Sequence, residues 1–301
     1  MLKLIPFLII LVPLVVCGIA IIISKRRYNR FANPLTKAMR RPPGAQLGRE
    51  LGAEQLECGF SVAELVFLSM LPISVFMLFQ ERLNRTLPLL FVSIAVIIWI
   101  IWSAVLIARI INRFHRIRQL RLGYECELAV GQELDLLMLN GFRIFHDVPA
   151  ENFNIDHIVI GPTGVFAVET KGRSKVLSEN GKGKKQFRAV YKDGVLQFPN
   201  GLDRETVPQA IRQAKWATRW LSQATGQPVQ ARPLVILPGW FIENQYKPDV
   251  PVIASGYIQG YFLAQKQVVL SEKDIAQIVY QIDQKVRDLE PGEVVRPLPV
   301  D

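Results

Sequence analysis

Residues 154–171 read Asn-Ile-Asp-His-Ile-Val-Ile-Gly-Pro-Thr-Gly-Val-Phe-Ala-Val-Glu-Thr-Lys, which are two short apolar segments around a Gly-Pro-Thr-Gly turn. If Pro162 and Thr163 form the turn, the segments pair as antiparallel strands and Asp156 lies opposite Glu169. Opposed residues of such a pair have Cβ atoms roughly 5 Å apart. Lys171 follows Glu169 by two residues and therefore shares its face. A divalent cation between the two carboxylates is the simplest reason for a sheet to tolerate them.

Composition excludes several classes of protein. The chain has 301 residues, is 50% hydrophobic and holds only three cysteines, so it is neither disordered nor stapled by disulfides. Its cysteines and three histidines lack the spacing of a zinc site. The net charge of +10 does not indicate a DNA-binding domain, because residues 1–122 hold 16 Lys/Arg and 5 Asp/Glu, whereas residues 123–301 hold 20 and 21. The basic excess lies in the apolar N-terminal part, which indicates a membrane.

Three apolar segments are long enough to span a bilayer. The first, residues 4–23, is followed by Lys25-Arg26-Arg27, which favours an uncleaved anchor over a cleaved signal peptide. Residues 60–79 and 87–108 flank a short polar loop and are expected to form a helical hairpin. Basic residues gather after the first and third segments, so the positive-inside rule places the N-terminus outside and everything after residue 108 in the cytoplasm. We therefore expect a multi-pass protein of the inner (cytoplasmic) membrane whose basic clusters contact anionic lipids.

The chain divides into six predicted parts: a transmembrane helix (1–24), a basic cytoplasmic loop (25–59), a transmembrane helical hairpin (60–108), a basic juxtamembrane stalk (109–122), a soluble domain (123–290) and a flexible tail (291–301). Within the soluble domain the patterns predict helices at 124–140, 207–225 and 271–289, and further strands at 142–148, 187–191, 195–198, 229–237 and 250–254. The hairpin strands are apolar on both faces. We therefore expect an α/β fold with helices on each side of a central mixed sheet.

The hairpin and the residues before it resemble a known family. A Gly-x3-Glu helix, a Phe-x3-His-Asp-Val strand and the hairpin itself are similar to the nuclease-related domain (NERD) family, a branch of the PD-(D/E)xK nuclease superfamily, over roughly residues 123–240. The resemblance implies a restriction-endonuclease-like αβββαβ core. It also implies that Asp156 and Glu169 bind Mg2+ (or Mn2+), with the carbonyl of Thr170 as a further ligand.

The resemblance assigns roles to two more residues. Lys171 would orient or activate the attacking water and steady the charge on the phosphate. Glu127 matches the helix glutamate that reaches the same metal site, although helical periodicity alone permits Glu125 or Glu133 instead. Gln209 and Gln213 lie one helical turn apart, where related domains carry a glutamine, and the sequence does not decide which of them supports the site.

A basic stretch after the hairpin is the expected phosphate-binding feature. It includes Lys182, Lys184 and Lys185 in a Gly-rich segment, and Arg188 shortly after it. The competing interpretation is a solvated hairpin or a contact with anionic lipid.

These observations predict a membrane-anchored cytoplasmic domain that hydrolyses phosphodiester bonds in DNA or RNA with a divalent metal. Mg2+ prefers one or two carboxylates, keeps several waters and takes further oxygens from a phosphate. Two alternatives remain. The domain binds nucleic acid or another phospho-ligand without turning it over, or the acids and the lysine form an ion-pair cluster without metal in a structural, partner-binding domain.

Overall fold

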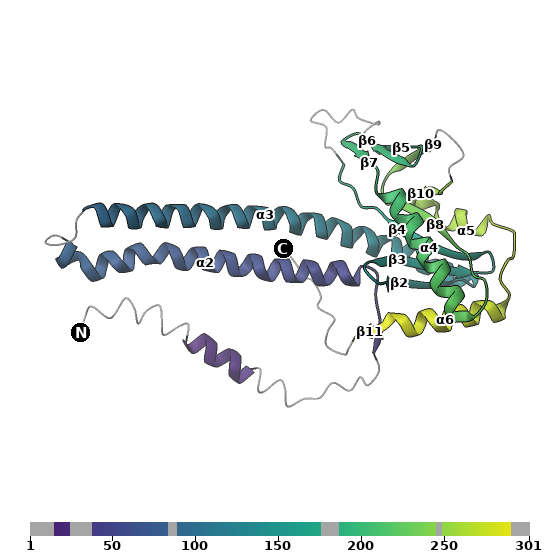
Figure 1. The fold of residues 1–301 in the computed structure, drawn as a ribbon, viewed down its shortest axis with the longest axis horizontal. Coiled ribbons are helices and arrows are strands. Elements are labelled where there is room, and N and C mark those ends of the chain that lie inside the picture. The colour runs from purple at the N-terminus through teal and green to yellow at the C-terminus, as the bar shows by residue number, and fades with distance from the viewer. Residues whose placement is uncertain (1–14, 25–37, 84–88, 176–186, 245–248, 290–301) are drawn as a thin grey trace. The chain divides into compact units, whose positions relative to one another are not determined.

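The computed structural model describes residues 15–24, 38–83, 89–175, 187–244 and 249–289 of the chain (Figure 1). Its residues divide into two compact units. One comprises residues 1–36 and 52–118, and the other comprises residues 37–51 and 119–301. Two long helices, α2 (Ala45–Leu83) and α3 (Leu89–Asp135), contribute residues to both units.

The first unit is mainly helical and apolar. Inside it, Trp99 Nε1 donates to the carbonyl of Leu68 at 3.1 Å, so α2 and α3 are in contact. Among the described residues, one helix, Ser93–Asn140, is long and apolar enough to cross a membrane by length and composition, and Val15–Ser24 is a shorter apolar helix. The first expected span lies largely outside the described residues. Three spans therefore remain a prediction.

One expected loop is partly helical in the structure, because α2 begins at Ala45, inside the segment expected as a loop at 25–59. Helix α3 is continuous through the expected stalk at 109–122 and the first part of the helix expected at 124–140. The first turns of α2 are ordered by distant packing: Leu51 is only 1% exposed, and the ring of Tyr124 lies against Gly44 and Gly48. A count of charges along the chain cannot reveal such contacts, because the partners are far apart in sequence.

The second unit is built on a five-stranded sheet. Its strands, in spatial order, are β10 (Val252–Ala254), β8 (Ala231–Leu237), β4 (Gly164–Thr170), β3 (Asn154–Gly161) and β2 (Arg143–Pro149). Strands β2, β3 and β4 are antiparallel neighbours, whereas β8 is parallel to β4 and β10 is parallel to β8. The expected mixed α/β fold with a central mixed sheet is confirmed.

The hairpin has the predicted register. His157 pairs with Val168 and Gly161 pairs with Gly164, which leaves Pro162 and Thr163 in the turn. Only glycine suits position 161, because an added Cβ would lie 2.3 Å from the ring of Phe142.

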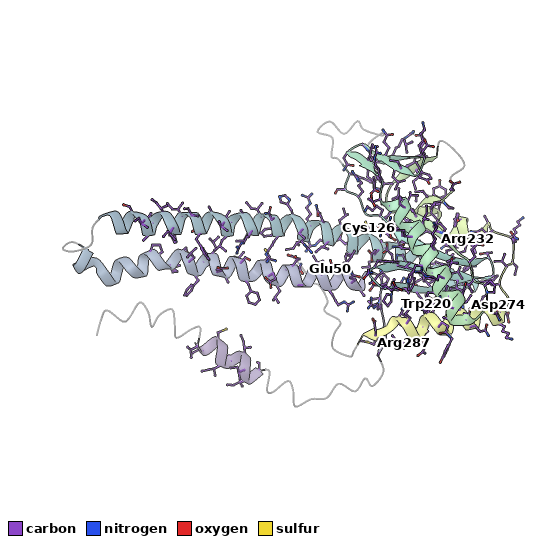
Figure 2. The ribbon with its side chains drawn as sticks, viewed as in Figure 1. Glu50, Cys126, Trp220, Arg232, Asp274 and Arg287 are labelled. Atoms are coloured by element: carbon purple, nitrogen blue, oxygen red, sulfur yellow. The ribbon has the colours of Figure 1, made fainter. Side chains whose placement is uncertain are left out.

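Helices cover both faces of this sheet. Helices α4 (Thr206–Thr225) and α6 (Glu272–Val286) pack on the face that carries Ile158 and Ile160. The C-terminal end of α3, the 3-10 helix η2 (Leu136–Asn140) and α5 (Ile258–Leu263) pack on the face that carries Val159, Phe166 and Val168. Both assignments follow from the alternation of the hairpin residues. Figure 2 labels Asp274 near the start of α6, where its backbone N–H donates to the Ser271 side chain in a capping box.

Smaller elements complete the second unit. A four-stranded sheet has the order β7 (Gly201–Asp203), β6 (Val195–Phe198), β5 (Arg188–Lys192) and β9 (Phe241–Asn244). Strands β5 and β6 correspond to the strands expected at 187–191 and 195–198, whereas β7 and β9 have no clear pattern in the sequence. Strand β1 (Met39–Arg40) pairs with β11 (Arg287–Leu289), and a 3-10 turn, η4 (Ser255–Tyr257), precedes α5.

Candidate metal and phosphate site

Asp156 lies opposite Glu169 across the β3–β4 ladder, next to the pair formed by His157 and Val168. Its Oδ2 accepts a hydrogen bond from the backbone N–H of Thr170 at 2.7 Å. Burial raises the pKa of Asp156 well above its usual value, and the charge of Glu169 raises it further. The two carboxylates therefore repel each other.

Glu169 is 4% exposed and is held by two glutamines of α4. Its Oε2 accepts from Nε2 of Gln213 at 2.7 Å and from Nε2 of Gln209 at 3.0 Å. Burial raises the pKa of Glu169 to about 7, although the bond from Gln213 and the charge of Lys171 lower it. The sequence left open which of the two glutamines supports the site, and in the structure both donate to Glu169.

Lys171 follows Glu169 at the end of β4. Its Nζ lies 3.7 Å from Oδ2 of Asp203, whose other oxygen accepts from the backbone N–H groups of Glu205 and Thr206 at the start of α4. These hydrogen bonds and the charge of Lys171 outweigh burial and lower the pKa of Asp203. Asp203 is thus an ionised partner for the lysine ammonium, whose charge also acts on Glu169.

Glu127 is the acid that α3 contributes. It is 9% exposed, whereas Glu125 and Glu133 face solvent. Burial raises its pKa to about 8, and the charges of Asp147 and Glu169 raise it as well. The structure therefore places Glu127, and neither exposed alternative, beside the acids of the sheet.

Asp147 is a further acid next to the site, and sequence reasoning missed it. The β2–β3 register places it opposite Asp156, between the pairs His146–His157 and Val148–Ile155. Its backbone is in the left-handed region, with φ of 48°. The only sequence signal is an acid inside an apolar strand.

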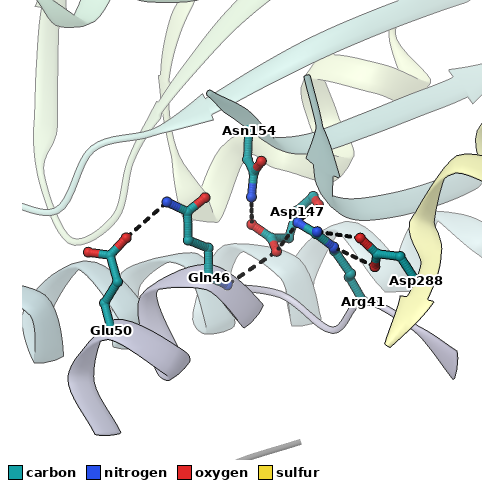
Figure 3. Close-up of polar contacts among 6 residues, drawn as sticks. All are labelled: Arg41, Gln46, Glu50, Asp147, Asn154 and Asp288. Carbon is teal, nitrogen blue, oxygen red and sulfur yellow. Dashed lines mark hydrogen bonds and ion pairs between the residues drawn. The ribbon is translucent and has the colours of Figure 1, made fainter. Parts of the chain in front are cut away.

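Asp147 is held by three donors (Figure 3). Its Oδ2 accepts from Nη1 of Arg41 at 3.1 Å and from the backbone N–H of Gln46 at 3.2 Å, and its Oδ1 accepts from Nδ2 of Asn154 at 2.8 Å. Arg41 also forms an ion pair with Asp288. Sequence reasoning assigned Arg41 to a membrane-flanking loop, because a contact across 106 residues has no local signal.

The contacts of Asp147 continue to the metal site. The carbonyl of Asn154 accepts from Nε2 of Gln213 at 3.2 Å, and the same nitrogen donates to Glu169. A chain of hydrogen bonds thus connects Arg41, through Asp147, Asn154 and Gln213, to Glu169.

A histidine pair, of which His157 is fully buried, holds Thr170 from the other face of the sheet. Nε2 of His157 lies 3.2 Å from Oγ1 of Thr170, and Nδ1 of His157 lies 2.9 Å from Nδ1 of His146. His146 in turn contacts Asp135 at 3.1 Å. Burial lowers the pKa of His157 well below its usual value, so its ring is neutral at physiological pH. This pair positions the strand end that contains the Thr170 carbonyl.

The expected phosphate-binding lysines, Lys182, Lys184 and Lys185, lie outside the described residues. Arg188 begins β5, and its Nη1 lies 3.4 Å from Oε2 of Glu243. Both side chains are about half exposed, so this pair is a surface contact that an anion can replace.

The donor set suits a hard cation that needs few protein ligands. Among residues 15–24, 38–83, 89–175, 187–244 and 249–289, no group of three or more His, Cys, Asp or Glu side chains is arranged to hold a metal ion. Mg2+ needs only one or two carboxylates, with water and phosphate as its other ligands. Oδ1 of Asp156 and Oε1 of Glu169 accept no hydrogen bond from the described part of the chain. A cation between these oxygens would relieve the repulsion that raises the pKa of Asp156.

A comparison with known families matches one part of the chain. Residues 122–238 match NERD, the nuclease-related domain. The family resemblance of this segment is therefore confirmed. The matched segment runs from the end of α3 to the end of β8 and contains the paired acids, the lysine and both glutamines. No curated protein and no solved structure matches the chain. Arg41, which contacts an acid of the nuclease-related domain, lies outside the matched segment.

Proposed function

We propose that the nuclease-related domain hydrolyses phosphodiester bonds of DNA or RNA with Mg2+ or Mn2+, and that N-terminal helices anchor it to a membrane. The observation that carries the proposal is the pair of register-matched acids, Asp156 and Glu169, beside Lys171. Two carboxylates and an amine next to each other are the groups that metal-assisted phosphate chemistry requires.

Each residue has a distinct task in this proposal. Asp156 and Glu169 would hold the metal with the carbonyl of Thr170, and Glu127 would add a further acid. The bound ion supplies polarisation of the phosphoryl oxygen and a lowered pKa for a bound water. Gln209 and Gln213 orient the Glu169 carboxylate through their two hydrogen bonds.

Lys171 acts on the phosphate and the attacking water. Its ammonium is kept near the acids by Asp203, so it can stabilise the negative charge that develops as the phosphate is attacked. Lys182, Lys184, Lys185 and Arg188 would contact phosphates farther along the substrate.

Three N-terminal spans would place the N-terminus outside and the nuclease-related domain in the cytoplasm. The apolar helix Ser93–Asn140 and the basic residues that follow the first and third expected spans support this topology. Cell fractionation should recover the chain in the inner membrane. Protease added to intact cells should leave the domain uncut, and digestion of the domain would contradict the topology.

Nuclease assays with end-labelled DNA and RNA test the activity. The detergent-purified chain should cut with Mg2+ or Mn2+ and stop in excess chelator. Asp156→Asn and Lys171→Ala should each lower the rate by about a hundredfold or more. Lys192→Ala, which removes an exposed lysine at the end of β5, is the matched control and should keep the activity.

Two outcomes would change the proposal. Full activity in both Asp156→Asn and Lys171→Ala would exclude this site. Calorimetric binding of metal and oligonucleotide, without product after long incubation, would instead assign a non-catalytic binding module.

A further inference from the structure

Three cations occupy alternate positions in the segment that leaves the site. Lys171, Arg173 and Lys175 follow β4 at every second position. Lys171 lies beside Glu169, so the row begins at the acids and leads away from them.

The backbone of this segment is fixed by hydrogen bonds from both sides. Trp240 Nε1 donates to the carbonyl of Arg173 at 3.2 Å, and Asn200 Nδ2 donates to the carbonyl of Ser174 at 3.3 Å. Nε of Arg173 also donates to Oδ1 of Asn200 at 3.0 Å. The positions of the cations are therefore set before any ligand binds.

Aromatic rings, and not acids, support the two outer cations. The guanidinium of Arg173 lies 4.7 Å from the ring centre of Phe198. Nζ of Lys175 lies 4.5 Å from the ring centre of Phe187 and 5.9 Å from that of Trp240. In the described part of the chain, neither cation has a carboxylate within ion-pair distance, whereas Lys171 and Arg188 each have one.

This difference decides which cations are available to a ligand. An aromatic face orients a cation without cancelling its charge, so Arg173 and Lys175 keep a full positive charge for an external anion. Arg188 can bind an external anion only after its ion pair with Glu243 breaks. A row of fixed charges that no carboxylate of the described residues pairs with suits a ligand with regularly repeated anions, and the phosphate backbone of one nucleic-acid strand is such a ligand.

We propose that Arg173 and Lys175 bind successive phosphates of a single nucleic-acid strand whose neighbouring phosphate lies at Asp156, Glu169 and Lys171. Only the phosphate at Asp156, Glu169 and Lys171 rests on the proposed function. The exposed ring of Phe187, with 47% of its surface accessible, is placed to stack on a base of the same strand.

Binding without cleavage tests this inference. Fluorescence anisotropy of a labelled single-stranded DNA oligonucleotide is measured on the detergent-solubilised chain in excess chelator, over about 0.05–0.2 M salt. Each lost phosphate contact lowers the salt slope of log K by about 0.7 for a single strand, so Arg173→Gln with Lys175→Gln should lower it by about 1.4. The same relation gives about a 25-fold loss of affinity at 0.1 M salt.

Matched controls separate local contacts from net charge and from misfolding. Arg219→Gln with Lys215→Gln removes the same two charges from the exposed face of α4 and should leave the slope unchanged. Exchanging the pair as Arg173→Lys with Lys175→Arg keeps both charges and should restore most of the affinity. Lys175→Gln alone, at an exposed position, should lower the slope by about 0.7 without changing the melting temperature.

The outcomes distinguish this inference from the proposed activity. A normal salt slope in the Arg173 and Lys175 variants, or no DNA binding by the parent chain, overturns the inference even if metal-dependent cutting is observed. A lowered slope without any cutting keeps the inference and removes the catalytic proposal. Binding to vesicles of anionic lipid that exceeds DNA binding, and that the two substitutions abolish, would assign the row to lipid phosphates instead.

Discussion

Glu169→Gln should stabilise the metal-free protein at pH 8. Burial raises the pKa of Glu169 from 4.5 to about 7, so the folded chain must ionise a carboxylate that resists ionisation. Glutamine has nearly the same shape and no charge, and its carbonyl oxygen can still accept the bonds from Gln209 and Gln213. The substitution therefore removes a cost and keeps the contacts.

The size of the effect follows from the pKa. One pKa unit corresponds to about 1.4 kcal/mol, so a shift of this size makes ionised Glu169 cost on the order of 3 kcal/mol at pH 8. The folded carboxyl binds its proton more tightly than the unfolded one, so stability falls as pH rises between about 4.5 and 7. The gain from Glu169→Gln should be absent near pH 4, grow through this window and be complete at pH 8.

Thermal unfolding of the 301-residue chain in chelator measures this gain. About 3 kcal/mol corresponds to a rise of roughly 6–12 °C in the melting temperature of a domain of this size. Glu243→Gln is the matched control, because Glu243 is half exposed and pairs only at the surface with Arg188. It should move the melting temperature by no more than about 2 °C.

The reasoning would be refuted by an unchanged or lower melting temperature of Glu169→Gln at pH 8. A gain of the same size at pH 4 and pH 8 would also refute it, since ionisation would then not be the cause. Added Mg2+ gives a second check: it should stabilise the parent chain and leave Glu169→Gln unaffected.

Three further predictions concern the surroundings of the site. Arg41→Ala should cost about 3–5 kcal/mol in urea unfolding, because it leaves a buried acid without its cation. Arg40→Ala removes an arginine whose side chain is 54% exposed and should cost at most about 1 kcal/mol; equal losses would contradict this. Mg2+ at about 100 times its Kd should stabilise the parent chain by about 2.7 kcal/mol, and Asp156→Asn should abolish this gain; a retained gain would place the metal elsewhere. Gly161→Ala should cost about 1–3 kcal/mol, because the new methyl group meets an aromatic ring, whereas Gly256→Ala has free space; matching melting temperatures would contradict the overpacking.

The hairpin shows how far local patterns reach. The turn, the register and the assignment of Ile158 and Val159 to opposite faces follow from alternation over a few residues, because a strand has a period of two. The order of helices and strands around the mixed sheet follows from the same kind of pattern and from the family resemblance. The boundaries of the long helices α2 and α3 do not follow from local patterns, because packing against distant residues decides where these helices begin and end.

The candidate metal site likewise has one contact that local sequence predicts and others that depend on how the elements pack. The approach of Asp156 to Glu169 is a matter of register within one hairpin, so a short sequence contains it. The contact of Gln213 with Glu169 depends on how α4 lies on the sheet, which no pattern in either segment specifies. The aromatic support of Arg173 and Lys175 likewise joins segments that are distant in sequence.

By itself, the sequence determined that an apolar, basic N-terminal part precedes an α/β domain, and it predicted that two acids and a lysine share one hairpin. Only the tertiary structure decided that Glu127 is the buried acid of α3, that both glutamines hold Glu169 and that Arg41 holds Asp147. The physical reason is the separation along the chain over which each interaction acts. Strand alternation acts over neighbouring residues, whereas burial, ion pairing and hydrogen bonding between elements exist only after the helices and sheets have packed together.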